Sequence, residues 1–341
     1  MGADARFYER LGPLTAAEIA DAIDGRVAGD GDAPVDNVAA PASAEARDLF
    51  FLTTIEEDGR APSAGVAIGP ADLAARLDGL AAVIVHDSPK TAFAKAAPLI
   101  VRPRRHLGDA LIHPDARIAD GADVGPGCAI GPDAEIAEGA WIGPGAVIGP
   151  GVTVGRGTRI GARAVLGFCL IGEGCEISAG AVIGESGFGL AQADGALFTL
   201  PHMGRVIIED DVTLGANVTV DRGMFIDTVL RRSCRIDNLS HIAHNVEVGE
   251  HAVMAAFAGV SGSVTVGRGV QFGGRVGVAD HLSIGENARL AADAAIMRDV
   301  PAGETWAGSP GQPISRFMRE VAWIRRESAR RPAKRGSKDE T

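Results

Sequence analysis

Four residues in the second half of the chain have types suited to acid–base chemistry: His244, Asp237, Gly262 and His281. An imidazole with an ordinary pKa of about 6.5 is a suitable general base near neutral pH. A carboxylate such as Asp237 can hold an imidazole in one orientation, and a glycine N–H such as that of Gly262 can donate to an oxyanion. The sequence contains no Gly-x-Ser-x-Gly nucleophile motif. These residues therefore favour direct attack by an acceptor group with His244 as the general base, and not a covalent intermediate on a serine.

All four residues lie in a region where an aliphatic residue recurs at every sixth position. The series begins at Ile112 and continues, with interruptions, to Ile296. This period is typical of hexapeptide β-helices, in which three short strands and three turns form a coil of about 18 residues. We expect the aliphatic residues to point inward and many of the 46 glycines to occupy turns. The register breaks at residues 184–205 and slips again after Ile226, which we interpret as facing inward.

The coil period converts sequence spacing into positions in space. Residues 18 apart lie on the same side of neighbouring coils, separated by roughly 4.8 Å. Gly262 follows His244 by 18 residues, and His281 follows it by 37, which places His281 two coils on and roughly 10 Å away. Asp237 precedes His244 by seven residues, on the adjoining side of the same coil. We expect the four residues to line one groove.

Metal binding is a second interpretation of the histidines. His241, His244 and His281 would lie on adjacent coils, and three histidines can hold zinc, as in a β-helical carbonic anhydrase. The three-residue spacing of His241 and His244 spans a turn, which makes convergence on one ion awkward. An exposed histidine on a turn, such as His251, commonly has no catalytic role.

Residues 1–105 lack the repeat and are expected to form a small α/β domain. Residues 15–18 read Thr-Ala-Ala-Glu, which is a capping box at the start of a helix. The apolar runs 81–85 and 99–101 are predicted as buried strands, with a helix over 89–97 between them.

Charge divides the chain unevenly. The net charge is −11, yet residues 316–341 hold nine Lys and Arg against four Asp and Glu. An acidic body makes nucleic acid an unexpected partner.

Four cysteines without a Cys-x-x-Cys pair indicate a reducing compartment, and no run approaches roughly 20 apolar residues, so we expect a cytoplasmic protein. Residues 106–312 are assigned to the β-helix and 313–341 to an amphipathic helix with a basic tail.

Several segments, in order along the chain, resemble the UDP-3-O-(3-hydroxyacyl)glucosamine N-acyltransferase family, the hexapeptide-repeat acyltransferases of lipid A biosynthesis. The resemblance covers nearly the whole sequence. It is carried by Gly-Glu-Ser-Gly-Phe-Gly at 184–189, Asp-Arg-Gly at 221–223, Ile-Asp-Asn-Leu at 236–239, Ile-Ala-His-Asn at 242–245, Gly-Val-Ser-Gly-Ser at 259–263 and Ala-Gly-Ser-Pro at 307–310.

The resemblance implies a left-handed parallel β-helix that forms a homotrimer with active sites between subunits. It implies acyl transfer from acyl carrier protein to a UDP-linked glucosamine amine, without a cofactor. It assigns the base to His244, its carboxylate neighbour to Asp237 and the oxyanion donor to Gly262. The substrate contacts that it implies are His281, Asn238, Asn245 and Phe51.

The N-terminal domain would hold the uracil, for which the family uses Phe-Leu-x-Asn-x-x-Tyr. Residues 51–57 read Phe-Leu-Thr-Thr-Ile-Glu-Glu, so Thr54 and Glu57 stand in place of the amide and the second aromatic residue. Phe51 is equally well explained as a core residue.

Three other functions remain open from the sequence. A related β-helix O-acyltransferase that acts on UDP-N-acetylglucosamine shares the fold and the base, but lacks the N-terminal domain. A zinc-dependent β-helical hydratase would use the histidines as ligands, and a trimeric scaffold would need none of them. Because acyl carrier protein is acidic, we expect Arg319, Arg325 and Arg326 of the C-terminal helix to dock it.

Overall fold

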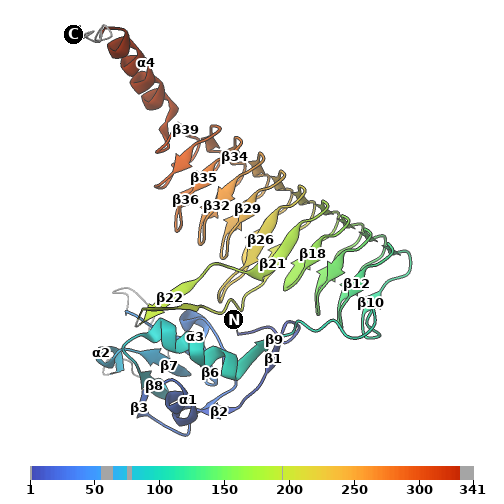
Figure 1. The fold of residues 1–341 in the computed structure, drawn as a ribbon, viewed down its shortest axis with the longest axis vertical. Coiled ribbons are helices and arrows are strands. Elements are labelled where there is room, and N and C mark those ends of the chain that lie inside the picture. Colours follow the sequence, from blue (N-terminus) through green and yellow to red (C-terminus); the bar gives the residue numbers. More distant parts are fainter. Residues whose placement is uncertain (1, 55–63, 75–78, 194, 331–341) are drawn as a thin grey trace, which may run out of the picture.

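The computed structural model describes residues 2–54, 64–74, 79–193 and 195–330. A small α/β domain lies beside the middle of a long parallel β-helix, and helix α4 (Ile314–Arg330) projects beyond the last coils (Figure 1). The expected fold class is confirmed: mostly β, with a left-handed parallel β-helix between an N-terminal α/β domain and a C-terminal helix. None of the described helices is long and apolar enough to cross a membrane.

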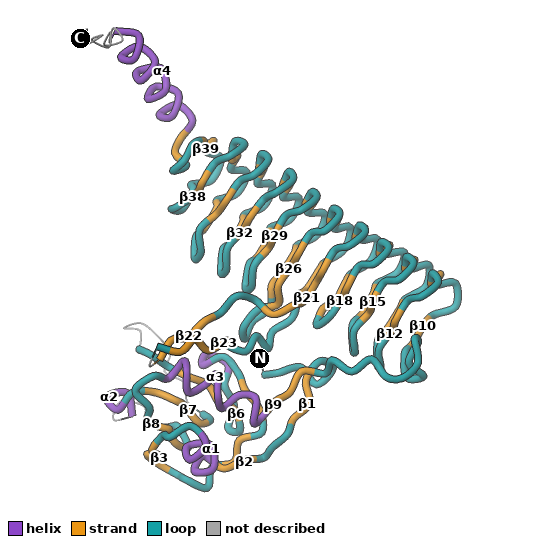
Figure 2. The backbone as a smooth tube through the Cα atoms, in the orientation of Figure 1, coloured by secondary structure: helices purple, strands orange, loops and turns teal. Residues whose placement is uncertain are grey.

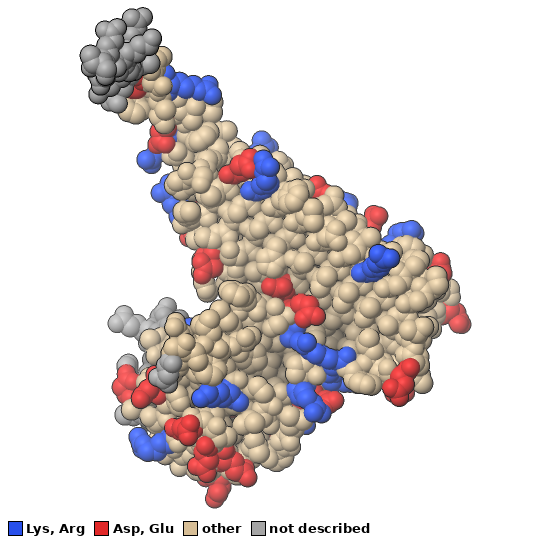
Figure 3. Space-filling view, in the orientation of Figure 1, with Lys and Arg blue, Asp and Glu red and all other residues tan. Residues whose placement is uncertain are grey.

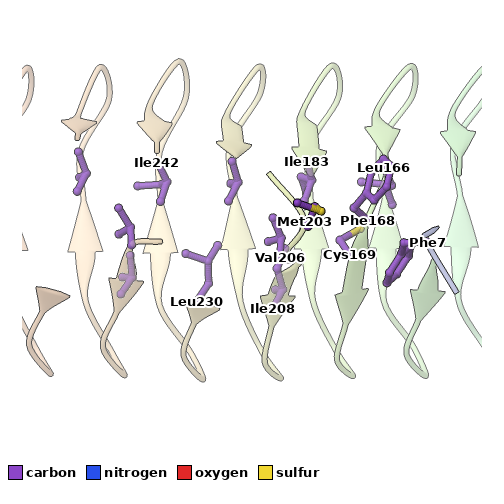
Figure 4. Packing of buried hydrophobic residues seen from close by; sticks show 14 of the residues in the cluster. Phe7, Leu166, Phe168, Cys169, Ile183, Met203, Val206, Ile208, Leu230 and Ile242 are labelled. Carbon is purple, nitrogen blue, oxygen red and sulfur yellow. The ribbon is translucent and has the colours of Figure 1, made fainter. Parts of the chain in front are cut away.

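The β-helix consists of three parallel sheets whose strands succeed one another around each coil. Most strands are two residues long and alternate with turns (Figure 2). Ile118 of β10 (Arg117–Ile118) pairs with Ile136 of β13 (Glu135–Ile136), which pairs with Val154 of β16 (Thr153–Val154). These spacings of 18 confirm the coil period. The aliphatic residues stack inward, and Figure 4 shows this packing for coils in the middle of the helix.

One sheet positions the candidate site. Its successive strands are β21 (Val182–Ser186), β26 (Thr219–Arg222), β29 (His241–Ile242), β32 (Gly259–Val260), β35 (Gly277–Val278) and β38 (Ala295–Ile296). His241 is in register with Thr219 on one side and Gly259 on the other. The outer face of this sheet thus changes from larger to small side chains toward the C-terminus.

The two breaks in the repeat are insertions of different kinds. Residues 184–205 leave the coil as a hairpin, β22 (Leu190–Ala193) and β23 (Ala196–Thr199), which contacts the N-terminal domain. The second break is a loop around residues 223–227, and the inward-facing residue after it is Leu230. The assignment of Ile226 as inward-facing was wrong: its side chain is 60% exposed. The extra residues lengthen that coil from 18 to 22, since Val220 pairs with Ile242.

The N-terminal domain contains a five-stranded sheet covered by helices. Its strand order is β3-β8-β7-β6-β5, with bounds β3 (Arg26–Gly29), β8 (Ala82–Val85), β7 (Val66–Gly69), β6 (Asp48–Phe51) and β5 (Asn37–Val38). The capping box is confirmed, because Thr15 and Glu18 cap each other at α1 (Ala16–Ala22). The prediction of a strand over 99–101 was wrong. Helix α3 (Pro89–Ile100) continues through Ile100, and the strand β9 (Val101–Pro103) begins at the next residue.

The domain is attached to the β-helix through contacts made by its first residues. Asp4 accepts from Arg205 at 2.8 Å, and the Tyr8 hydroxyl donates to the carbonyl of His202 at 2.9 Å. The Phe7 and Phe168 rings lie 5.7 Å apart (Figure 4). Both hydrogen bonds reach the segment that follows the hairpin, so the N-terminus fixes that segment against the coils that carry the candidate site.

Candidate active site

A groove of about 650 Å³ follows the outer face of the sheet that contains β26, β29, β32 and β35. His244, Gly262 and His281 line it, as the coil spacing predicts. Their backbones are stacked: Ser263 N–H donates to the His244 carbonyl and His281 N–H to the Gly262 carbonyl, each at 3.0 Å. The groove is otherwise lined by Phe188, Asp221, His241, Ala243, Gly259, Val260, Ser261, Gly277, Val278, Ala279, Asp280, Ala295, Ile296 and Met297.

The amide of Asn245 holds the His244 ring. Asn245 has a left-handed φ of 61°, a conformation that asparagine tolerates, and its Nδ2 donates to the Ile226 carbonyl at 3.0 Å. The Oδ1 atom therefore faces the Met224 N–H at 3.1 Å and His244 Nδ1 at 3.0 Å. This network assigns the imidazole proton to Nδ1, because Oδ1 can only accept. The lone pair of His244 then lies on Nε2, which is the form that a general base requires.

Gly262 lies against the same ring. A Cβ built on Gly262 would be 2.6 Å from His244 Cε1 and 2.7 Å from Nε2. Within the described part of the chain, the Gly262 N–H donates to no acceptor. A free N–H beside the basic nitrogen is the arrangement needed to stabilise a tetrahedral oxyanion.

A second histidine, His202, packs edge-on against His244 with the ring centroids 4.9 Å apart. His202 is 2% exposed, and its Nδ1 lies 3.0 Å from the Leu200 carbonyl. Burial and the positive fields of His244 and Arg222 lower the pKa of His202 to about 4. The ring is therefore neutral near pH 7 and supports His244 without adding charge. Sequence spacing missed it because it lies in the insertion, where the coil period does not apply.

Asp221 is the carboxylate that faces the histidines. It lies on β26, one coil before Ala243, and its Oδ2 is 3.7 Å from Nε2 of His241. Nδ1 of His241 in turn lies 2.7 Å from the Thr219 hydroxyl. Burial raises the pKa of Asp221, although the positive fields of His241 and His244 oppose the rise. The slip in the six-residue register was the signal that could have identified Asp221 from the sequence. Counting 22 residues for this coil, and not 18, places Asp221 beside Ala243.

Asp237, by contrast, does not lie beside His244 in the same chain. It follows β28 (Arg235–Ile236) of a neighbouring sheet, so Asp237 and His244 lie on the turns before and after β29. Its Oδ1 accepts from the backbone N–H of Asn238 at 2.7 Å. The Asn238 Oδ1 accepts from the Ala216 N–H at 2.6 Å on the same edge. Asp237 therefore lies on the adjoining side of the same coil, as the spacing predicts, but it does not line the groove of its own chain, and its role at His244 stays a prediction.

Phe51 lies where the N-terminal domain meets the loop after β26. Its ring centroid is 5.1 Å from that of Phe93 and 6.0 Å from that of Phe225. It is partly buried and packs against the core. Glu57, at the far end of the segment that begins with Phe51, lies outside the described residues. Phe188, which lines the groove, is 84% exposed.

The arginines of α4 fall into two groups. Arg316 pairs with Glu320 and Arg330 with Glu327 along the helix. In residues 314–330 as described, Arg319, Arg325 and Arg326 are exposed, and no carboxylate lies within 4.0 Å of them. Figure 3 shows both basic and acidic side chains along this projecting helix.

The zinc interpretation finds no ligand set in the described ranges. No group of three His, Cys, Asp or Glu side chains there is arranged to hold a metal ion. His241 is engaged by Thr219 and Asp221, and Nδ1 of His244 by Asn245.

Comparisons with known proteins agree with the repeat. Residues 133–168 match the model of bacterial transferase hexapeptide (six repeats), and residues 205–238 match that of the hexapeptide repeat of succinyl-transferase. A protein of Caulobacter sp. (strain K31), named UDP-3-O-acylglucosamine N-acyltransferase, is 47% identical over 97% of this chain and 98% of its own. A protein of the same name from Maricaulis maris is 45% identical over 95% of this chain and 96% of its own.

Among solved structures, an LpxA protein from Acinetobacter baumannii aligns with a TM-score of 0.48 and 27% identity. The alignment covers 67% of this chain and 86% of that one.

Proposed function

Because the chain belongs to the UDP-3-O-acylglucosamine N-acyltransferase family, we propose that it transfers a 3-hydroxyacyl group from acyl carrier protein to the 2-amine of UDP-3-O-(3-hydroxyacyl)glucosamine in lipid A biosynthesis. The observation that carries the proposal is the contact between His244 and Gly262, which brings a basic nitrogen and a free N–H to one point of a groove. A scaffold protein would need neither.

The reaction requires a group that accepts a proton and a hydrogen-bond donor that stabilises the oxyanion. The amine nitrogen attacks the thioester carbonyl carbon and forms the C–N bond, while His244 Nε2 takes a proton from the nitrogen. The Gly262 N–H donates to the oxyanion of the tetrahedral intermediate. The C–S bond then breaks, and the proton on His244 passes to the departing sulfur. The products are the amide and the free thiol of the carrier.

The acyl chain would lie along the small residues beyond His241. Gly259, Gly277 and Ala295 follow His241 in register on the outer face, and Met297 borders the far end of the groove. An outward glycine leaves a trough between the turns, and an apolar trough binds a hydrocarbon chain.

The sugar nucleotide would contact His281, Asn238, Asn245 and Phe51, as the family resemblance implies. His281 lines the groove, and the Asn245 side chain is already engaged by His244. Phe51 offers the uracil only the part of its ring left free by Phe93 and Phe225.

A homotrimer is part of the proposal. The α4 side chains Ile314, Phe317, Val321 and Ile324 recur at heptad-like spacing, and none of the residues of this helix is buried in the single chain. Such a stripe is covered when equivalent helices pack together. In a cyclic assembly the edge that carries Asp237 and Asn238 would face the groove of a neighbouring subunit, since cyclic interfaces join different surfaces. Asp237 would then act on the neighbour's site.

Acyl carrier protein would dock near the last coils through Arg319, Arg325 and Arg326. An acidic body repels an acidic carrier, and a local group of unpaired cations accelerates their encounter. The proposal includes a cytoplasmic location, which the thioester donor and the four free, buried cysteines support.

The test is an acyl-transfer assay with hydroxyacyl carrier protein and the UDP-linked amine, followed by mass spectrometry. We expect His244→Ala to lower the rate by roughly 10²–10⁴-fold with an unchanged melting temperature. His251→Ala is the matched control, because His251 is exposed on a turn outside the groove. Absence of N-acylation by the wild type, or normal turnover in His244→Ala, would contradict the proposal.

A further inference from the structure

An amine acceptor poses a problem that a hydroxyl acceptor does not. Amines of this kind have pKa values near 8 and reach the enzyme mostly as ammonium ions near neutral pH. The nitrogen cannot attack a thioester until one proton leaves. A site that selects amines therefore gains from a carboxylate that binds the ammonium beside the base.

Asp221 has the location for this task. The register that pairs Val220 with Ile242 places Asp221 on the outer face, beside the turn that begins with Ala243 and carries His244. Its side chain lines the groove and is only 15% exposed. Asp280, the other carboxylate of the groove, is exposed to solvent and lies three coils further along.

The Asp221 carboxylate also lacks a strong partner. Across the described residues no hydrogen bond reaches it, and its nearest ionic neighbour is His241 at 3.7 Å. The adjacent Arg222 does not neutralise it by contact, because that guanidinium is turned inward. It donates to the carbonyls of His202 and Gly184 at 2.8 and 2.7 Å, and it lies over the Phe168 ring.

The charges around Asp221 come from three coils. Arg222 on its own strand, His241 on β29 and His244 on the following turn attract the carboxylate, and Glu185 on β21 opposes them. Burial raises the pKa of Asp221 in spite of the positive neighbours. A half-buried carboxylate without a contacting cation is costly to maintain, and a ligand cation removes that cost.

We infer that Asp221 binds the ammonium group of the acceptor and directs it toward His244, and so selects amine over hydroxyl acceptors. This inference rests on the proposed function, because it requires an amine acceptor. Of the three ammonium protons, one remains on the amide nitrogen, one reaches the departing sulfur through His244 and one is released to water.

The test measures acceptor binding by calorimetry in the absence of the acyl donor. Two ligands are compared: the UDP-linked acceptor with its free amine, and the same molecule with that amine acylated to a neutral amide. For Asp221→Asn we expect amine binding to weaken by roughly 10–100-fold, the range for a lost charge-assisted hydrogen bond, and amide binding to change by less than about threefold. Glu185→Gln, which removes a charge one coil away and outside the groove, should change neither by more than about threefold.

A second measurement needs no variant. Wild-type affinity for the amine should fall as the pH rises from 7 to 9 through the amine's pKa, while affinity for the amide stays level. A flat amine profile, or an Asp221→Asn variant that binds both ligands like wild type or loses both equally, would overturn the inference. Wild-type turnover of the amine is checked first, so that failure of the enzyme assignment is distinguished from failure of the role of Asp221.

Discussion

The imidazole of His244 lies directly against the backbone of Gly262, one coil further along the β-helix. A methyl group on Gly262 would overlap Cε1 and Nε2 of the ring at 2.6 and 2.7 Å. The backbone φ of Gly262 is not positive, so a side chain at this position would cause no backbone strain. The obstacle to substitution is the His244 ring. The absence of a side chain at position 262 thus serves the site and not the turn.

Gly262→Ala should inactivate the enzyme without unfolding it. The new methyl group would displace His244 Nε2 from the N–H that stabilises the oxyanion, and loss of one such donor costs roughly 10²–10³-fold in kcat. The melting temperature should change by no more than a few degrees. Gly167→Ala is the control, because a Cβ there meets no atom within 4 Å. An active Gly262→Ala variant would show that the two groups do not act together.

Acid should weaken the attachment of the N-terminal domain at Asp4. Burial alone would raise the pKa of Asp4, but hydrogen bonds from Arg6 and Arg205 lower it from 3.8 to about 2. A depressed carboxyl pKa stabilises the folded state above the unfolded value, and the contribution is lost as the pH falls from 3.8 toward 2. We expect the charged Asp4 side chain to stabilise the folded state by about 1 kcal/mol at pH 6. The melting temperatures of wild type and Asp4→Asn should therefore differ by roughly 2–4 °C at pH 6 and converge near pH 2.

The control for that measurement is Asp21→Asn, on the exposed face of α1. Its melting temperature should follow that of the wild type at every pH. A constant gap between wild type and Asp4→Asn down to pH 2 would show that the Asp4 side chain acts through packing and not through its charge.

The sequence was sufficient for every feature that follows the coil period. Ile118, Ile136 and Val154 stack at spacings of 18, and the same arithmetic places Gly262 beside His244. The period is informative because each coil must bury one aliphatic residue per side, and a shift by one residue would turn that residue to solvent.

The residues that sequence reasoning missed lie where an insertion changes the coil length. Asp221 precedes the loop at 223–227, so a count in steps of 18 does not bring it to His244. His202 lies in the longer insertion, and its contact with His244 depends on how Tyr8 and Arg222 hold the His202 carbonyl. Asp237 lies on the adjoining side of the same coil, as the spacing predicts, but outside the groove that His244 lines.

Assembly should be visible in solution as a particle of three times 35.0 kDa. Light scattering at micromolar concentration measures this directly. Val321→Asp would introduce a charge into the apolar stripe of α4 and should weaken the trimer, because a buried charge without a partner is unfavourable. Ala322→Asp, an exposed position beside the stripe, is the matched control. A stable, fully active monomer would contradict the proposed assembly.

The last prediction concerns the three unpaired arginines of α4. Reversing Arg319, Arg325 and Arg326 to Glu should raise the Michaelis constant for the acylated carrier protein several-fold and flatten its dependence on salt, because long-range attraction between the partners is removed. The constant for the sugar nucleotide should not change, since the groove is lined by residues of the coils and of the hairpin insertion, and α4 contributes none.

The control for the charge reversal is the triple change of Arg117, Arg156 and Arg163 to Glu. These arginines are also exposed, but they lie in the N-terminal half of the β-helix, away from α4. This control variant alters the net charge by the same amount as the α4 variant. A similar rise of the Michaelis constant for the carrier protein in both variants would therefore indicate a general repulsion by the acidic body. If the α4 variant matches wild type in both constants and in its salt response, the carrier protein docks elsewhere.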